Sequence, residues 1–187
     1  GKHPTHVLQP ETDTSVALGC ASMSILRNYA GEDDAAGNIM VAGMDLSASL
    51  RIWELDENLD ETLDHAASSS SPTELRPKVE LLLSNATGTA VALAPPRTIM
   101  PHLKVLLVAV AFLDGSVALV STGIPVPTTV EDTKLKLPEA GTIVESWGTG
   151  SALACRLVFR PDKSQLAVSR QDGTVDLISV VDSNNRH

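Results

Sequence analysis

Two segments of this chain, residues 40–54 (MVAGMDLSASLRIWE) and residues 165–179 (QLAVSRQDGTVDLIS), follow one pattern. Each begins with a short run of small apolar residues, passes through an aspartate and a small polar residue, and then alternates apolar with polar side chains. Alternation with a period of two is typical of a half-buried β-strand, and a polar turn between two such strands predicts a β-hairpin. A hairpin that recurs within one sequence indicates a repeat architecture, which constrains the fold more than any other feature.

Further segments of the same kind occur along the chain. Asp114-Gly115 and Asp172-Gly173 each lie between apolar runs. Asp-Gly is a strong hairpin signal because the turn needs positive φ angles. We therefore predict an all-β fold with antiparallel strand pairing. The predicted hairpins cover residues 16–27, 39–53, 79–93, 104–120 and 155–180.

The segments between the predicted hairpins differ from them in composition. Residues 1–15 are polar, and we expect them to form an extended lead-in to a single domain that spans residues 1–187. Residues 54–76 are acidic and then rich in serine, which predicts an exposed connection; a short helix with a stripe of leucines is the alternative. Residues 121–150 contain several prolines and glycines, which predicts a long loop with room for one or two edge strands.

The last segment resembles a WD repeat, the unit of one family of β-propellers. Residues 157–162 (LVFRPD), 166–169 (LAVS) and 172–178 (DGTVDLI) give the order of that repeat: an apolar strand with Phe-x-Pro-Asp, a strand of small residues, and Asp-Gly-x-Val. Residues 49–53 (SLRIW) match the strand that ends in tryptophan. The chain departs from the pattern at Glu54, where the family usually has aspartate. Ile178 and Ser179 replace the Trp-Asp pair, and the Gly-His dipeptide that often opens a repeat is absent.

This resemblance implies a WD-repeat-like β-propeller, in which each blade is a twisted four-stranded sheet. An inner strand of a blade faces neighbouring blades on both sides, which fits the continuous apolar run 105–113. The resemblance also assigns structural roles in the repeats to eight residues. They are Trp53, Asp45, Asp114, Gly115, Pro161, Asp162, Asp172 and Gly173.

Repeat spacing limits the number of blades. The intervals between the expected turn residues are 25, 40, 27 and 58 residues, whereas WD repeats recur roughly every 40–45 residues. At that repeat length the 187 residues form about four blades, so we expect a partial or incomplete ring and a chain that belongs to something longer. The two short intervals favour a β-sandwich or another all-β binding domain as the alternative. The expected turn residues are Met23, Ala48, Gly88, Gly115 and Gly173.

Charge and cysteine content bear on the partners and the compartment. The net charge of −9 and the absence of a basic run argue against direct nucleic-acid binding. Cys20 and Cys155 both lie in apolar strand-like segments, so we expect buried free thiols and an intracellular, cytoplasmic or nuclear protein. The longest apolar run, residues 105–113, is too short to span a bilayer, and no membrane association is expected.

The sequence contains no convincing catalytic set. Its five histidines are scattered, and none pairs with a carboxylate at a metal-ligand spacing on a predicted strand. We therefore predict no catalytic, cofactor-binding or metal-binding residues. Trp147, in the loop before the last segment, is a candidate contact for a partner if exposed, with core packing as the alternative.

Repeats without a catalytic set favour a non-catalytic scaffold, a WD-repeat-like subunit of a larger multiprotein complex. Its partners would be other protein subunits in a hetero-oligomeric assembly. This step from fold to function is an analogy. The alternatives are a propeller-fold hydrolase that holds a metal in its central channel, and another all-β binding domain.

Overall fold

The computed structural model describes residues 6–8, 20–27, 38–56, 73–83, 87–94, 105–126, 138–148, 152–160 and 165–180. These residues form strands and turns without any helix, and they confirm the predicted all-β class. Accordingly, nothing in the described ranges is a helix long and apolar enough to cross a membrane. A short parallel pair, β1 (His6–Leu8) with β5 (Thr73–Leu75), is separate from three larger antiparallel sheets.

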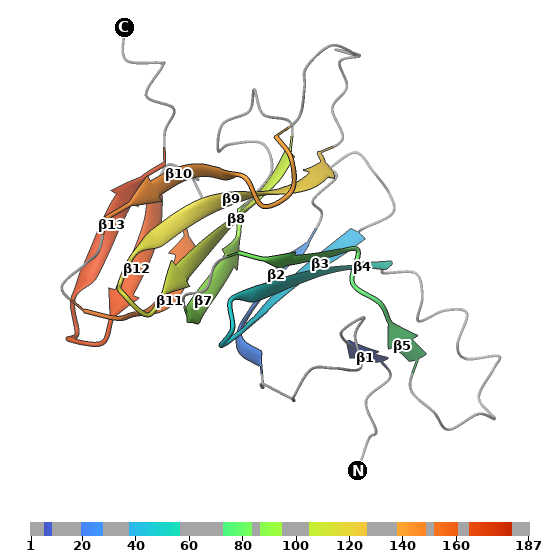
Figure 1. Cartoon of the computed structure of the whole chain (residues 1–187), viewed down its shortest axis with the longest axis horizontal. Helices are drawn as coiled ribbons and strands as arrows, with labels where there is room; N and C mark the ends of the chain where they lie inside the picture. The colour runs from blue at the N-terminus through green and yellow to red at the C-terminus, as the bar shows by residue number, and fades with distance from the viewer. Residues whose placement is uncertain are drawn as a thin grey trace, which may run out of the picture.

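The three antiparallel sheets follow one another along the chain and share one plan (Figure 1). In each, the strands lie side by side in the order in which the chain makes them, so that each sheet is an antiparallel meander. The first sheet contains β2 (Cys20–Arg27), β3 (Asn38–Asp45), β4 (Ser49–Asp56) and β6 (Val79–Leu82). The second contains β7 (Gly88–Leu93), β8 (Val105–Phe112), β9 (Val117–Pro125) and β10 (Ile143–Trp147). The third contains β11 (Ala154–Phe159), β12 (Gln165–Arg170) and β13 (Val175–Ser179).

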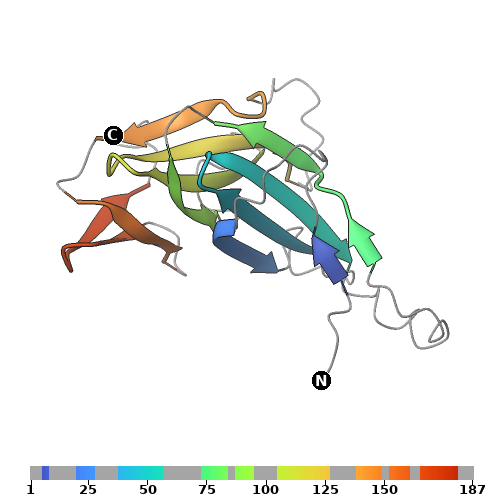
Figure 2. The same cartoon turned by 60° about the horizontal axis from the view of Figure 1, so that its bottom comes forward.

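The second sheet lies between the other two and is buried on both faces (Figure 2). Strand β8 shows this directly, because its side chains point alternately to opposite faces and all of them are buried. Leu106 and Val108 pack against the first sheet, whereas Leu107 and Ala109 pack against the third. A strand buried on both faces reads as a continuous apolar run rather than an alternating one. The prediction that this run forms an inner strand is therefore confirmed.

The first strands of the three sheets lie together. Strand β7 contacts β2 on one side and β11 on the other. Because β7 is the edge of its sheet, some of its backbone N–H groups point away from β8. The N–H groups of Val91 and Leu93 donate to the side-chain oxygens of Ser22 and Ser24, at 3.0 Å each. Two donors that an edge strand leaves unpaired are thus satisfied by the neighbouring sheet.

One type of turn joins the second and third strands of every sheet. In each turn the fourth residue has a positive φ angle, 57° at Ala48, 82° at Gly115 and 85° at Gly173. Its N–H donates to the carbonyl of the residue three positions earlier. These are three of the five turn residues expected from the sequence. They are 67 residues apart between Ala48 and Gly115 and 58 apart between Gly115 and Gly173, so the repeat is longer than that of a WD repeat.

Two predicted hairpins are wrong. Met23 lies within the continuous strand β2, so no turn divides residues 20–27. Strands β6 and β7 do not pair with each other: β6 is the last strand of the first sheet and β7 is the first strand of the second. Gly88, the other expected turn residue, is the first residue of β7. The second error arises because a strand that leaves one sheet for the next has the same composition as a strand that turns back.

Some segments expected to be connections contain strands. Strand β9 continues to Pro125, and β10 lies at the edge of the second sheet, where the sequence left room for an edge strand. The lead-in and the acidic connection contribute β1 and β5. The described residues form three antiparallel sheets where about four blades were expected, and these three sheets do not close into a ring.

Cys155 is a free and exposed thiol, so the prediction that it is buried is wrong. The pairing of β11 with β12 is irregular between Ala154 and Arg156. This irregularity interrupts the alternation of side chains, and the side chains of both Cys155 and Arg156 are exposed.

Candidate functional site

The aspartates at the turns of the second and third sheets make the same contacts. The Oδ1 atom of Asp114 accepts hydrogen bonds from the backbone N–H of Ser116 at 2.9 Å and from its hydroxyl at 2.6 Å. The Oδ1 atom of Asp172 accepts the same two bonds from Thr174, at 3.0 Å and 2.6 Å. In both sheets the turn aspartate therefore accepts hydrogen bonds from within its own turn.

These contacts stabilise the charged form of both aspartates. The hydroxyl of Ser116, together with its N–H, holds the pKa of Asp114 below the ordinary value of 3.8. The hydroxyl and N–H of Thr174 do the same for the pKa of Asp172. Hydrogen bonds to a carboxylate favour its ionised form, so both turns are best formed when the aspartates are charged.

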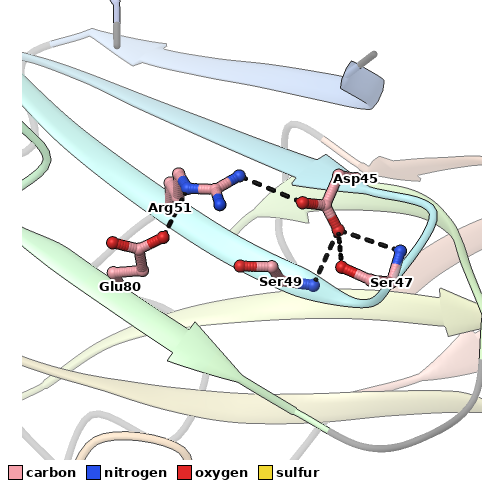
Figure 3. A network of polar contacts seen from close by, with 5 residues as sticks. All are labelled: Asp45, Ser47, Ser49, Arg51 and Glu80. Atoms are coloured by element: carbon pink, nitrogen blue, oxygen red, sulfur yellow. Dashed lines mark hydrogen bonds and ion pairs between the residues drawn. The ribbon is translucent and has the colours of Figure 1, made fainter. Parts of the chain in front are cut away.

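The turn of the first sheet carries a larger polar network, which links three of its strands (Figure 3). Asp45 Oδ1 accepts bonds from the N–H and the hydroxyl of Ser47 and from the N–H of Ser49, at 2.6–3.0 Å. Its other oxygen, Oδ2, lies 3.1 Å from an Nη atom of Arg51. The Nε atom of Arg51 lies 2.6 Å from Glu80 Oε1. The charges therefore alternate from negative to positive to negative across β3, β4 and β6.

Asp45 keeps a lowered pKa in this network. Burial raises the pKa of its carboxyl, but the bonds from Ser47, Ser49 and Arg51 together outweigh burial. A buried carboxylate with several donors is stable in its charged form. The network fixes the turn and also attaches β6 to the edge of the first sheet.

In the third sheet a buried arginine has several partners. Arg170 Nε donates to Asp176 Oδ2 at 2.5 Å. An Nη atom of Arg170 donates to the carbonyl oxygens of Ala152 at 2.7 Å and Gly115 at 3.1 Å. Gly115 belongs to the turn of the second sheet, so Arg170 connects the second sheet to the third through a bond between β12 and that turn.

The first strands of the three sheets line an open groove of about 560 Å³. Strands β2, β7 and β11 each contribute a run of residues to it, residues 22–26, 91–93 and 156–159. Three of its apolar side chains, Met23, Ile25 and Val158, are strongly exposed. Exposed apolar side chains that gather in one groove indicate a surface for a protein partner. This groove is the candidate interaction site.

The tryptophans singled out in the sequence are both packed. Trp53 lies in β4 opposite Val41 and is buried. Trp147 is half-buried at the end of β10 and packs against the core between the second and third sheets. It does not line the groove. Asp45, Asp114, Gly115, Asp172 and Gly173 lie at the turns described above, each turn in its own sheet. Pro161 and Asp162 lie outside the described residues.

Sequence reasoning missed the charged pairs beside the turns. Arg51 follows Asp45 by six residues, and Asp176 follows Arg170 by six residues, with a hairpin turn inside each interval. An interval of this length places the two side chains on adjacent strands and on one face. Opposite charges that flank a predicted turn would have indicated these pairs. No comparable signal marks Ser22 and Ser24, because their partners are backbone groups about 70 residues away.

No group of three or more potential metal ligands occurs among the described residues. Comparison with known proteins adds no relative: no known protein family matches the chain, and no curated protein matches it.

Proposed function

We propose that this chain is a non-catalytic interaction scaffold built from WD-repeat-like blades, an arc of a β-propeller within a larger protein complex. Three antiparallel meanders with one strand order and one turn type support this proposal. So does their stacking, with the first strand of each sheet beside that of the next. This is the plan of propeller blades around a central channel. Its partners on this proposal are other protein subunits inside the cell.

The observation that carries the proposal is the groove along the first strands. Met23 and Ile25 are 59% and 57% exposed, and they alternate along β2 with Ser22 and Ser24, whose side chains bond to β7. Apolar residues in such a place contribute little to the stability of the isolated chain, because their surface stays in water. They would contribute to binding if a partner covered them and removed their surface from water. Interfaces of this kind have an apolar centre and a polar rim.

The experiment is affinity purification of the full-length protein from its native cell under gentle conditions, followed by mass spectrometry. A reproducible, near-stoichiometric set of subunits supports a scaffold. The double variant Met23→Glu/Ile25→Glu should lose part of that set. Leu113→Glu is the matched control, because Leu113 is equally exposed but lies at the turn after β8, outside the groove.

Two results would count against the scaffold. Recovery of the protein alone would contradict it. A subunit set that the groove variant leaves unchanged, while the variant remains folded, would show that the groove is not the site of assembly.

A further inference from the structure

The first and third sheets carry equivalent charged pairs with the charges exchanged. The turns align through their positive-φ residues, Ala48 and Gly173. In this alignment Arg170 occupies the position of Asp45, and Asp176 occupies the position of Arg51. In each pair the two side chains form an ion pair, with a nitrogen–oxygen distance of 3.1 Å in the first sheet and 2.5 Å in the third. The equivalent positions of the second sheet, Phe112 and Ala118, are apolar.

The charged pair of the first sheet has a third member, Glu80, whereas the pair of the third sheet has none among the described residues. Arg51 is opposite Glu80 in the pairing of β4 with β6, and their side chains form an ion pair at 2.6 Å. In the second sheet, Ser146 of β10 is opposite Ala118 in the same way. The described part of the third sheet ends at β13, with no strand beside it on that edge. Asp176 is correspondingly open to solvent, with 46% of its side chain exposed against 14% for Arg51.

The fourth strands of the other two sheets also show what lies next to this position. Leu81 is opposite Leu50, and Trp147 is opposite Val117. Both side chains pack against an inter-sheet core. The equivalent of Leu50 and Val117 in the third sheet is Val175, which is 60% exposed. On the pattern of the other two sheets, a strand beside β13 would carry a large apolar residue opposite Val175 and cover part of its exposed surface.

We propose that β13 receives a strand from a partner protein, which pairs with it antiparallel and carries lysine or arginine opposite Asp176 and a large apolar residue opposite Val175. The charge expected on the partner strand follows from the first sheet, where Asp45, Arg51 and Glu80 are negative, positive and negative. In the third sheet Arg170 and Asp176 are positive and negative, so the residue equivalent to Glu80 would be positive. The backbone groups on the free edge of β13 supply affinity, as in other cases of strand addition, and the two side chains supply specificity. This inference rests on the repeat of the sheets and goes beyond the proposed groove function.

The test uses the full chain and two fluorescent synthetic peptides. Both have the sequence of residues 77–83, which include β6; one keeps glutamate at the position of Glu80 and the other has lysine there. We expect the lysine peptide to bind more tightly, by roughly two- to five-fold, the range of a partly exposed ion pair. Binding is measured by fluorescence anisotropy, and hydrogen exchange should show new protection in β13.

Two variants of the protein test the assigned charge. Asp176→Lys should reverse the preference between the peptides. Asp176→Asn should abolish the preference while keeping a group that accepts a bond from Arg170, which matters if the lysine variant does not fold. Glu139→Lys is the matched control, because it makes the same change of charge at an exposed residue in the turn before β10 and should leave the preference unchanged.

Several outcomes would overturn the proposal. They are equal binding of the two peptides, binding no tighter than that of a scrambled peptide, and a preference that survives in Asp176→Asn. Protection, in the chain alone, of the β13 amides that point away from β12 would show that another segment of this chain covers the edge. Protection that grows with protein concentration would show a second copy there. The groove variant Met23→Glu/Ile25→Glu should bind the peptides normally, so failure of one proposal is distinguishable from failure of the other.

Discussion

Leu119 and Leu177 occupy the same position in two successive sheets, each four residues after the positive-φ glycine of its turn, yet Leu119 is fully buried and Leu177 is 65% exposed. Leu119 packs into the core between the second and third sheets. Leu177 is on the face of the third sheet that points away from that core.

This difference gives the first prediction. Leu119→Ala should lower the free energy of unfolding by about 2–5 kcal/mol, because it leaves a cavity in a packed core. Leu177→Ala removes the same atoms from an exposed site and should change it by less than about 0.5 kcal/mol. Urea unfolding of both variants checks this. A large loss in Leu177→Ala would mean that its face is covered in the free protein.

Arg170 should be important for the junction of the second and third sheets. Arg170→Ala leaves two carbonyl oxygens, those of Gly115 and Ala152, without their donor, and it should lower the free energy of unfolding by about 2–5 kcal/mol. Arg156→Ala, at an exposed arginine of the same sheet, is the control and should be near neutral. Equal effects of the two substitutions would show that Arg170 does not join the sheets.

The serines of β2 should protect the edge of β7. In Ser22→Ala/Ser24→Ala the N–H groups of Val91 and Leu93 lose their acceptors. We expect a loss of about 1–3 kcal/mol and faster hydrogen exchange at these two amides. Ser146→Ala, at an exposed serine, should leave both amides unchanged. Unaltered exchange in the double variant would show that solvent satisfies these groups equally well.

The turn aspartates should make the fold sensitive to acid. Their pKa values are lowered in the folded chain, so their contribution is fully present above the unfolded pKa of about 3.9 and is lost as the pH falls through the folded values. The free energy of unfolding should therefore be insensitive to these groups near neutral pH and should decrease below about pH 4. Asp45→Asn should reduce that decrease, which denaturant titrations at pH 7, 5 and 3 would measure. An unchanged acid profile in this variant would contradict the role given to Asp45.

Much of the fold was predictable from local signals. Asp114-Gly115 and Asp172-Gly173 fixed two turns, and the alternating residues around Arg51 indicated a third, because hairpins are determined by residues close in sequence. The continuous apolar run from Val105 also predicted a strand buried on both faces. The assignment of strands to sheets was harder to predict from the sequence. Nothing local distinguishes the passage from β6 to β7, which changes sheets, from a hairpin.

The site was predicted less well than the fold. The groove brings together β2, β7 and β11, whose groove residues, 22–26, 91–93 and 156–159, are far apart in the chain. Only the stacking of whole sheets makes them neighbours. Trp147 was a candidate partner contact because it is a large residue in a predicted loop, but it packs against a core. The exposed residue Met23 was read as part of a turn, although its exposure follows from its place on a first strand.

The middle position of the second sheet has a consequence for how the molecule loses its structure. Strand β8 has a neighbouring sheet on each face, so neither outer sheet can detach without exposing some of its apolar side chains to water. The three sheets are therefore expected to melt as one unit, with the amides of β8 the last to exchange. A proteolytic fragment that ends before Ala154 would lack the third sheet. Its second sheet would expose Leu107, Ala109 and Leu119 to water as an apolar surface to which other chains could bind.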